Sequence, residues 1–215
     1  MIDPAELAAG NPDPVDRACF NPNSVLPFGL TTDHVAQTME SFIHFLGFIN
    51  GQLVTQGIER LESMLMPANF SSVVGEYMIS NIPKFCPMLT KNTYHNGHPD
   101  LVPAGVFLNN AAQHAPDGIE VKASRYTSGW QGHNPEDCWL MVFVFDSNRP
   151  ADAAAGLAPK PFRFLGVVGG KLTMADWSFS GRTGESRRTI TASVRPSGRT
   201  AMVANWIYKI PGSGF

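Results

Sequence analysis

The sequence predicts a single α/β domain, in which a helical segment comes first and a central mixed β-sheet flanked by helices follows. Three observations support this class. Apolar residues recur at helical spacing within residues 31–85, whereas after residue 86 they fall into short β-prone runs bounded by turn residues. Residues 139–145 (WLMVFVF) are almost all apolar, which is typical of a strand buried on both faces. The length of 215 residues and the apolar fraction of 43% suit one domain with a sizeable core.

The first part of the chain divides into a leader and a helical segment. Residues 1–30 hold five prolines with several Asp, Asn and Gly, so we expect an irregular leader. The helical segment follows three candidate N-caps, Thr31, Thr32 and Asp33. Three glycines, Gly47, Gly51 and Gly57, are expected to break it into two helices, the second ending before Pro67. A further helix is expected to begin at Ser71 or Ser72 and to end at Pro83.

The remainder, residues 86–215, is predicted to form the sheet. Strands are expected over residues 88–94, 101–108 and 119–123, the last after the turn at residues 116–118. The pattern then predicts two strands, 162–168 and 172–179, joined as a hairpin by Gly169 and Gly170. Residues 189–194 are also strand-like, and residues 202–208 fit either a strand or a helix.

Composition excludes several classes of protein. No run approaches the roughly 18 to 20 apolar residues that a membrane helix needs. The acidic, proline-bearing N-terminus is not typical of a signal peptide. Three widely spaced cysteines, Cys19, Cys86 and Cys138, do not indicate a disulfide framework, so a cytoplasmic location is the simplest expectation.

Residues 98–124 carry the pattern with chemical meaning. Asp100 follows a proline at the start of one expected strand, and Glu120 and Lys122 lie two apart on the next. Side chains two apart on a strand share a face, so Glu120 and Lys122 project together while Val121 points into the core. If the two strands pair, the Asp100 carboxylate reaches Glu120. Two carboxylates suit Mg²⁺, and a nearby lysine can orient an attacking water.

Pro99-Asp100, a gap of nineteen residues and then Glu120-Val121-Lys122 resemble the signature of the PD-(D/E)xK nuclease superfamily. The resemblance covers roughly residues 71–145. It implies a restriction-endonuclease-like αβββαβ core. It also implies that Asp100, Glu120 and the Val121 carbonyl bind metal while Lys122 assists the water. Family members often carry a further glutamate on the preceding helix, and Glu76 has that placement.

The resemblance leads us to expect a Mg²⁺-dependent DNA endonuclease, with Mn²⁺ as a substitute ion. A type II restriction endonuclease that cuts double-stranded DNA as a homodimer fits best, because two centres are needed for two strands. Such an enzyme is a hydrolase acting on phosphodiester bonds. In this interpretation Glu76 binds a second metal ion or holds Lys122.

Two regions are candidate DNA contacts. Residues 1–159 hold 7 Lys and Arg against 16 Asp and Glu, whereas residues 160–215 hold 9 against 2. The basic part suits a polyanion partner, or it pairs with the acidic half of the same fold. Within it, the segment of residues 178–199 holds Arg182, Arg187, Arg188, Arg195 and Arg199, whose guanidinium groups match phosphates and guanine edges. In the polar loop after residue 124, the candidates are Arg125, Gln131 and His133.

Three other interpretations remain open. Glu120 and Lys122 also fit an ordinary surface ion pair beside a turn aspartate. The arginine-rich part alone would suit a nucleic-acid-binding protein without catalysis. A zinc site is a third possibility, although no paired Cys-x-x-Cys supports it. Its candidate ligands are Cys86, His95, His98, His114, His133 and Cys138.

Overall fold

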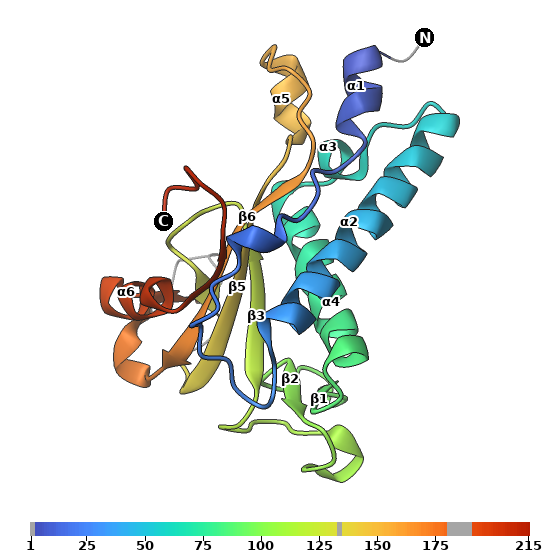
Figure 1. Ribbon diagram of the computed structural model, residues 1–215. Helices are drawn as coiled ribbons and strands as arrows, with labels where there is room; N and C mark the ends of the chain where they lie inside the picture. The colour runs from blue at the N-terminus through green and yellow to red at the C-terminus, as the bar shows by residue number, and fades with distance from the viewer. Residues whose placement is uncertain (1–2, 133–134, 180–190) are drawn as a thin grey trace, which may run out of the picture.

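The structure is a computed structural model that describes residues 3–132, 135–179 and 191–215. It has three layers around a central six-stranded sheet (Figure 1). Helices α2 (Thr32–Thr55) and α4 (Pro67–Phe85) cover one face. Helix α6 (Pro196–Ala204) and a small three-stranded sheet cover the other. The expected α/β class with a mixed sheet flanked by helices is therefore confirmed.

The main sheet has the strand order β1-β2-β3-β5-β6-β9. Its strands are β1 (Leu89–Lys91), β2 (Leu101–Pro103), β3 (Ile119–Ser124), β5 (Cys138–Asp146), β6 (Arg163–Leu172) and β9 (Trp206–Lys209). Strands β3 and β5 are parallel, and every other neighbouring pair is antiparallel. The small sheet has the order β4 (Gln131–Gly132), β8 (Ala192–Val194) and β7 (Trp177–Phe179). Apolar side chains from both faces of β5 make it the centre of the core, as predicted.

Helix α2 begins as expected but does not break at its glycines. Thr31 caps it through a capping box with His34. The helix continues through Gly47 and Gly51, so the predicted break there is wrong. Its inward face buries Phe42 and other large side chains against the sheet, and this packing outweighs the cost of about 1 kcal/mol for each glycine. The break lies instead at Gly57, which has a φ of 69° just after α2, and the second helix is the short α3 (Leu61–Met64), which ends before Pro67 as expected.

Helix α4 is longer than predicted at both ends. It begins at Pro67, since a proline fits the first turn of a helix, where its missing N–H has no intrahelical partner. Pro83 lies inside the last turn rather than ending the helix. Burial of Met78, Ile79 and Ile82 against the sheet offsets the one hydrogen bond that this proline removes.

The leader is less irregular than expected. It contains helix α1 (Pro4–Ala9) and the short 3₁₀ helix η1 (Arg17–Cys19). The buried Arg60 anchors it, because Arg60 Nε donates to Glu6 Oε2 at 2.8 Å and Nη1 to the Ala9 carbonyl. Further along, the Asn21 side chain donates to the Trp206 carbonyl at 2.9 Å, so the leader is fixed alongside β9.

The expected hairpin at Gly169 and Gly170 is wrong. Strand β6 runs straight through both glycines and pairs with β5 along its whole length. The ring of Trp139 lies where a side chain at Gly169 would stand, and Met202 of α6 packs over Gly170. Strand β7 belongs instead to the small sheet, after the 3₁₀ turn η3 (Met174–Asp176). Residues 202–208 divide between the end of α6 and β9, so both alternatives are found there.

The segment that resembles the nuclease superfamily contains a helix and four strands of the central sheet but not every element that the resemblance implies. Helix α4 precedes β1, β2 and β3, and β5 then runs parallel to β3. The helix expected between the third and fourth strands is not present in residues 125–132 or 135–137, which hold only β4. Elsewhere lie the short helix α5 (Pro150–Ala154) and the 3₁₀ turn η2 (Leu108–Asn110). Among the described residues, no helix is both long and apolar enough to cross a membrane.

Candidate active site

The site is built around the free edge of β3. Strand β2 pairs with β3 at only one position, Leu101 with Ile119, and then diverges. At the start of β2, Asp100 Oδ2 accepts a hydrogen bond from the Val121 backbone N–H at 2.9 Å. The N–H and C=O of one strand residue point to the same side, so the Val121 carbonyl faces this edge as well. A carboxylate and a carbonyl are thus directed toward the same open edge.

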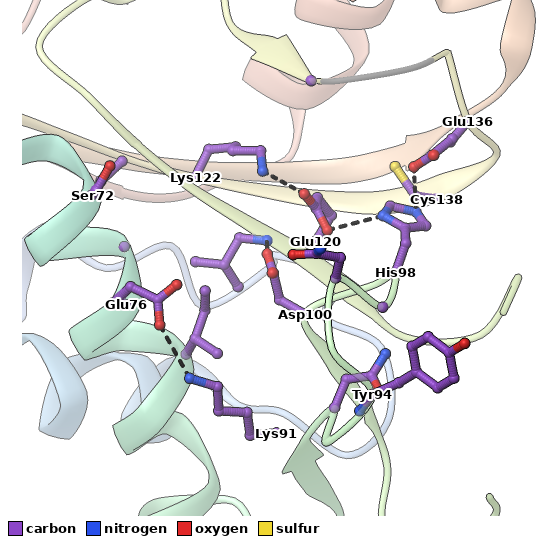
Figure 2. A pocket seen from close by; sticks show the side chains of 18 of the residues that line it. Ser72, Glu76, Lys91, Tyr94, His98, Asp100, Glu120, Lys122, Glu136 and Cys138 are labelled. Atoms are coloured by element: carbon purple, nitrogen blue, oxygen red, sulfur yellow. Dashed lines mark hydrogen bonds and ion pairs between the residues drawn. The ribbon is translucent and has the colours of Figure 1, made fainter. Parts of the chain in front are cut away.

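The alternation along β3 is the one that the sequence predicts. The Val121 side chain packs into the core beneath α4. Glu120 and Lys122 point to the opposite face, and Lys122 Nζ donates a short hydrogen bond to Glu120 Oε1 (Figure 2). Their side chains are largely buried, with 13% and 29% of the surface exposed. The pair is therefore enclosed by the protein and is not an ordinary surface ion pair.

A histidine completes the arrangement. His98 Nδ1 lies 3.0 Å from Glu120 Oε2, so the Glu120 carboxylate is held between Lys122 and His98 (Figure 2). On its other side, His98 Nε2 lies 2.8 Å from Glu136 Oε2, an ion-pair contact whose alignment is poor for a hydrogen bond. Sequence reasoning treated His98 only as a turn residue or zinc ligand. The available signal was its position two residues before Asp100, but Glu136 carries no local signal.

Burial and the contacts within the site raise the pKa values of Asp100 and His98 and lower that of Glu120. Burial, together with the negative charge of Glu120, raises the pKa of Asp100 to about 7. Burial also acts to raise the pKa of Glu120, but the hydrogen bond from His98 and the charge of Lys122 lower it to about 2. Burial acts to lower the pKa of His98, yet its contacts with Cys138, Glu120 and Glu136 raise it to about 11. Near neutral pH, Glu120 is therefore ionised and Asp100 is about half protonated.

Asp100, Glu120 and Lys122 line one pocket with a volume of about 950 Å³. Its walls come from α4, from the loop between β1 and β2, from β3 and from the small sheet. Glu76 also lines it, as the resemblance implies. However, Glu76 is 66% exposed and pairs with Lys91 at 3.1 Å (Figure 2). Glu76 therefore does not hold Lys122, although it remains at the wall of the same pocket.

The four predicted DNA-binding residues that the structure describes do not line this pocket. Arg125 is turned inward, donating to the carbonyls of Ser147 at 2.7 Å and Asn148 at 3.1 Å. Arg199 donates to the Thr127 carbonyl at 2.9 Å, so it also supports the fold. Gln131 lies on β4 of the small sheet and Arg195 lies at the start of α6, and both residues are exposed. Four further candidates, His133, Arg182, Arg187 and Arg188, lie outside the described residues.

The part of the chain that the structure describes contains no preassembled metal centre. Within residues 3–132, 135–179 and 191–215, no group of three or more His, Cys, Asp or Glu side chains is arranged to hold a metal ion, so no zinc framework is found there. Magnesium requires less from the protein, typically one or two carboxylates completed by water and phosphate. Asp100 and Glu120 are two carboxylates that line the same pocket, and the Val121 carbonyl faces the strand edge beside Asp100. Both oxygens of Glu120 also contact a cationic side chain, which keeps this carboxylate ionised.

Comparison of the chain with protein-family models, curated proteins and solved structures found no match.

Proposed function

We propose that this protein is a Mg²⁺-dependent nuclease of the PD-(D/E)xK type that hydrolyses phosphodiester bonds in DNA. One observation supports this above all. One pocket of about 950 Å³, at the open edge of β3, is lined by Asp100, Glu120 and Lys122. The first and last of these residues are 22 positions apart in the sequence. Two carboxylates that can bind Mg²⁺ and an ammonium that can stabilise charge on a phosphate are a combination suited to hydrolysis of a phosphodiester.

Each residue has a distinct role in the proposal. The carboxylates of Asp100 and Glu120 and the Val121 carbonyl would hold Mg²⁺. Bound there, the ion supplies a Lewis acid for the phosphoryl oxygen and lowers the pKa of a water molecule. The Lys122 ammonium stays charged, because Glu120 and Asp100 outweigh the effect of burial and raise its pKa. Lys122 can therefore hold the scissile phosphate and stabilise the charge that develops on it.

Glu76 lines the pocket but contacts neither Asp100 nor Glu120. Its exposed side chain is paired with Lys91 rather than with Asp100 or Glu120. We propose that it contributes to the binding of a second cation when substrate fills the pocket. The finer proposal of a type II restriction endonuclease that acts as a homodimer follows from the need to cut two strands with two centres.

The test is cleavage of supercoiled plasmid DNA by the purified full-length protein. The wild type is expected to nick or linearise the plasmid with Mg²⁺ or Mn²⁺ and to be inert with EDTA. Asp100→Asn should lose this activity by about 100-fold or more, because it removes one ligand charge while keeping an acceptor for the Val121 N–H. Asp117→Asn, at an exposed turn outside the pocket, is the matched control and should cut normally.

A protein that binds DNA but never cuts it under any of these conditions would contradict the proposal. The non-catalytic alternative would then hold, with the basic C-terminal part as the contact region. Equal activity of Asp100→Asn and the wild type would also contradict it, since the activity would then arise elsewhere or from a contaminant.

A further inference from the structure

An exposed aromatic side chain lies at the rim of the same pocket. Tyr94 belongs to the loop between β1 and β2, lines the pocket and is 43% exposed. Figure 2 shows it on the same side of the site as Asp100 and His98. The proposed chemistry uses the carboxylates and Lys122 and leaves Tyr94 without a role.

The loop that carries Tyr94 is held rigidly by a buried asparagine. Asn92 Oδ1 accepts from the backbone N–H groups of Tyr94 and Ala112, both at 3.0 Å. Asn92 Nδ2 donates to the carbonyls of Pro99 at 3.0 Å and Ala112 at 2.7 Å. The side-chain amide thus has both donors and both acceptor positions satisfied. The loop is fixed in place before any ligand binds.

The other end of the loop is equally constrained. The Gly97 N–H donates to the Tyr94 carbonyl at 3.0 Å and closes a turn. A side chain at Gly97 would collide with the Ala112 carbonyl and the Asn92 amide, so the turn packs directly on the loop that follows β2. Asn96 adopts a positive φ of 56°, which asparagine tolerates better than most residues. The Tyr94 ring is therefore an exposed aromatic surface on a preorganised support.

A nucleotide combines the two chemistries that this pocket presents. Its phosphate suits the Lys122 ammonium on the floor of the pocket, and its base has a flat face that stacks on an aromatic ring. Within a duplex both faces of a base are covered by its neighbours. A ring at the rim can therefore stack only on a base that is unpaired or has been turned out of the helix.

We propose that Tyr94 is a base-stacking residue and that the substrate presents an unpaired base next to the scissile phosphate. The substrate class is thus single-stranded DNA, or DNA with a locally unpaired nucleotide, in place of the fully paired duplex that a type II restriction endonuclease cuts. The inference rests on the proposed nuclease function for its choice of a nucleic acid.

The test measures binding of a fluorescent oligothymidylate of about 12 nucleotides, a length that spans a typical single-strand site. Fluorescence anisotropy is recorded without divalent cations, so that no strand is cut. Tyr94→Ala should weaken binding by about 10-fold, as expected for the loss of one base–aromatic stack, whereas Tyr94→Phe should change it by less than about 2-fold. Tyr126→Ala is the matched control, because Tyr126 is 63% exposed but does not line the pocket.

The same measurement on a fully paired duplex should show little difference between the wild type and Tyr94→Ala. Equal losses on single strand and duplex would overturn the proposal, as would unchanged single-strand binding by Tyr94→Ala. Loss in Tyr94→Phe would also overturn it, since the hydroxyl rather than the ring would then make the contact. Thermal unfolding of each variant checks that the fold is intact.

The outcomes distinguish this inference from the proposed function. If the wild type binds single strands through Tyr94 but cuts no DNA with Mg²⁺ or Mn²⁺, only the nuclease proposal fails. If it cuts DNA and Tyr94→Ala binds and cuts as the wild type does, only the stacking proposal fails.

Discussion

Asp100 Oδ2 accepts a hydrogen bond from the Val121 backbone N–H at 2.9 Å. It does so at a position of β3 where no residue of β2 is paired. One side chain thus satisfies an N–H at the open edge of β3 and lines the pocket at the same time. The arrangement depends on the register of β3. A slip by one residue would move Glu120 and Lys122 into the apolar layer under α4 and would expose Val121. The fold and the proposed chemistry are therefore fixed by the same strand pairing.

We expect Lys122→Ala to separate cleavage from metal binding. The two carboxylates remain, so Mn²⁺ binding measured by calorimetry should persist. Cleavage of plasmid DNA should fall by about 100-fold or more, because the charge that faces the phosphate is lost. Lys84→Ala, exposed at the end of α4, is the control and should cut as the wild type does. Wild-type cleavage by Lys122→Ala would show that this lysine has no part in the reaction.

Metal-free protein should lose stability between about pH 4.5 and pH 6 because of Asp100. Its pKa is raised by burial and by Glu120 to about 7, so the folded state keeps a proton that the unfolded state releases in this window. The free energy of unfolding should therefore fall as the pH rises. Asp100→Asn should flatten this dependence, as measured by urea denaturation at several pH values.

Glu120 and His98 change the free energy of unfolding only outside the range from about pH 4.5 to pH 6. Glu120, with a pKa lowered to about 2, loses its stabilising charge only as the pH falls below about 4.5. His98, with a pKa raised to about 11, loses its contribution only as the pH rises above about 6.5. The control variant Asp117→Asn should show the same fall of the free energy of unfolding between about pH 4.5 and pH 6 as the wild type. An unchanged slope in Asp100→Asn would mean that this carboxyl titrates normally.

Arg125→Ala is expected to reduce stability rather than DNA binding. The guanidinium donates to two backbone carbonyls of the β5–α5 connection and lies 5.6 Å from the ring centre of Phe70 and 5.0 Å from that of Phe145. Loss of these contacts should lower the free energy of unfolding by about 2–3 kcal/mol. Chemical denaturation measures this change. Normal stability with weakened DNA binding would instead support the role expected from sequence.

Glu76→Gln should have small effects. Its ion pair with Lys91 is exposed, and such pairs contribute about 0–1 kcal/mol. We expect cleavage to fall by less than in Asp100→Asn and the melting temperature to stay close to that of the wild type. Glu76→Gln matching the complete loss in Asp100→Asn would place Glu76 among the essential metal ligands.

Local patterns in the sequence were sufficient for the elements that carry the proposed chemistry. The alternation over residues 119–123 predicted β3, which ends one residue later, and the face of Glu120, and the apolar run after residue 138 predicted β5. The helix bearing Glu76 was also expected. In each case the information lies within a few consecutive residues, because the periodicity of one element decides which side chains are buried.

The features that were missed depend on contacts between distant segments. His98 and Glu136 are 38 positions apart, so no local pattern links them. Arg125 is predicted from the sequence to contact DNA, whereas its guanidinium lies against the β5–α5 connection and the ring of Phe70. The small sheet was not predicted as a unit, because its three short strands come from three separate parts of the chain.

The wrongly predicted hairpin at Gly169 leads to the last prediction. A Cβ at Gly169 would overlap the ring of Trp139, so Gly169→Ala must displace that ring or bend β6. We expect the free energy of unfolding to fall by about 1–3 kcal/mol, the usual cost of overpacking. Gly51→Ala in α2 is the control. Nothing lies within 4 Å of its added Cβ, so alanine should stabilise that helix by up to about 1 kcal/mol. Equal stability of the two variants would mean that β6 does not pack against Trp139 in this way, and that a turn at Gly169 is again possible.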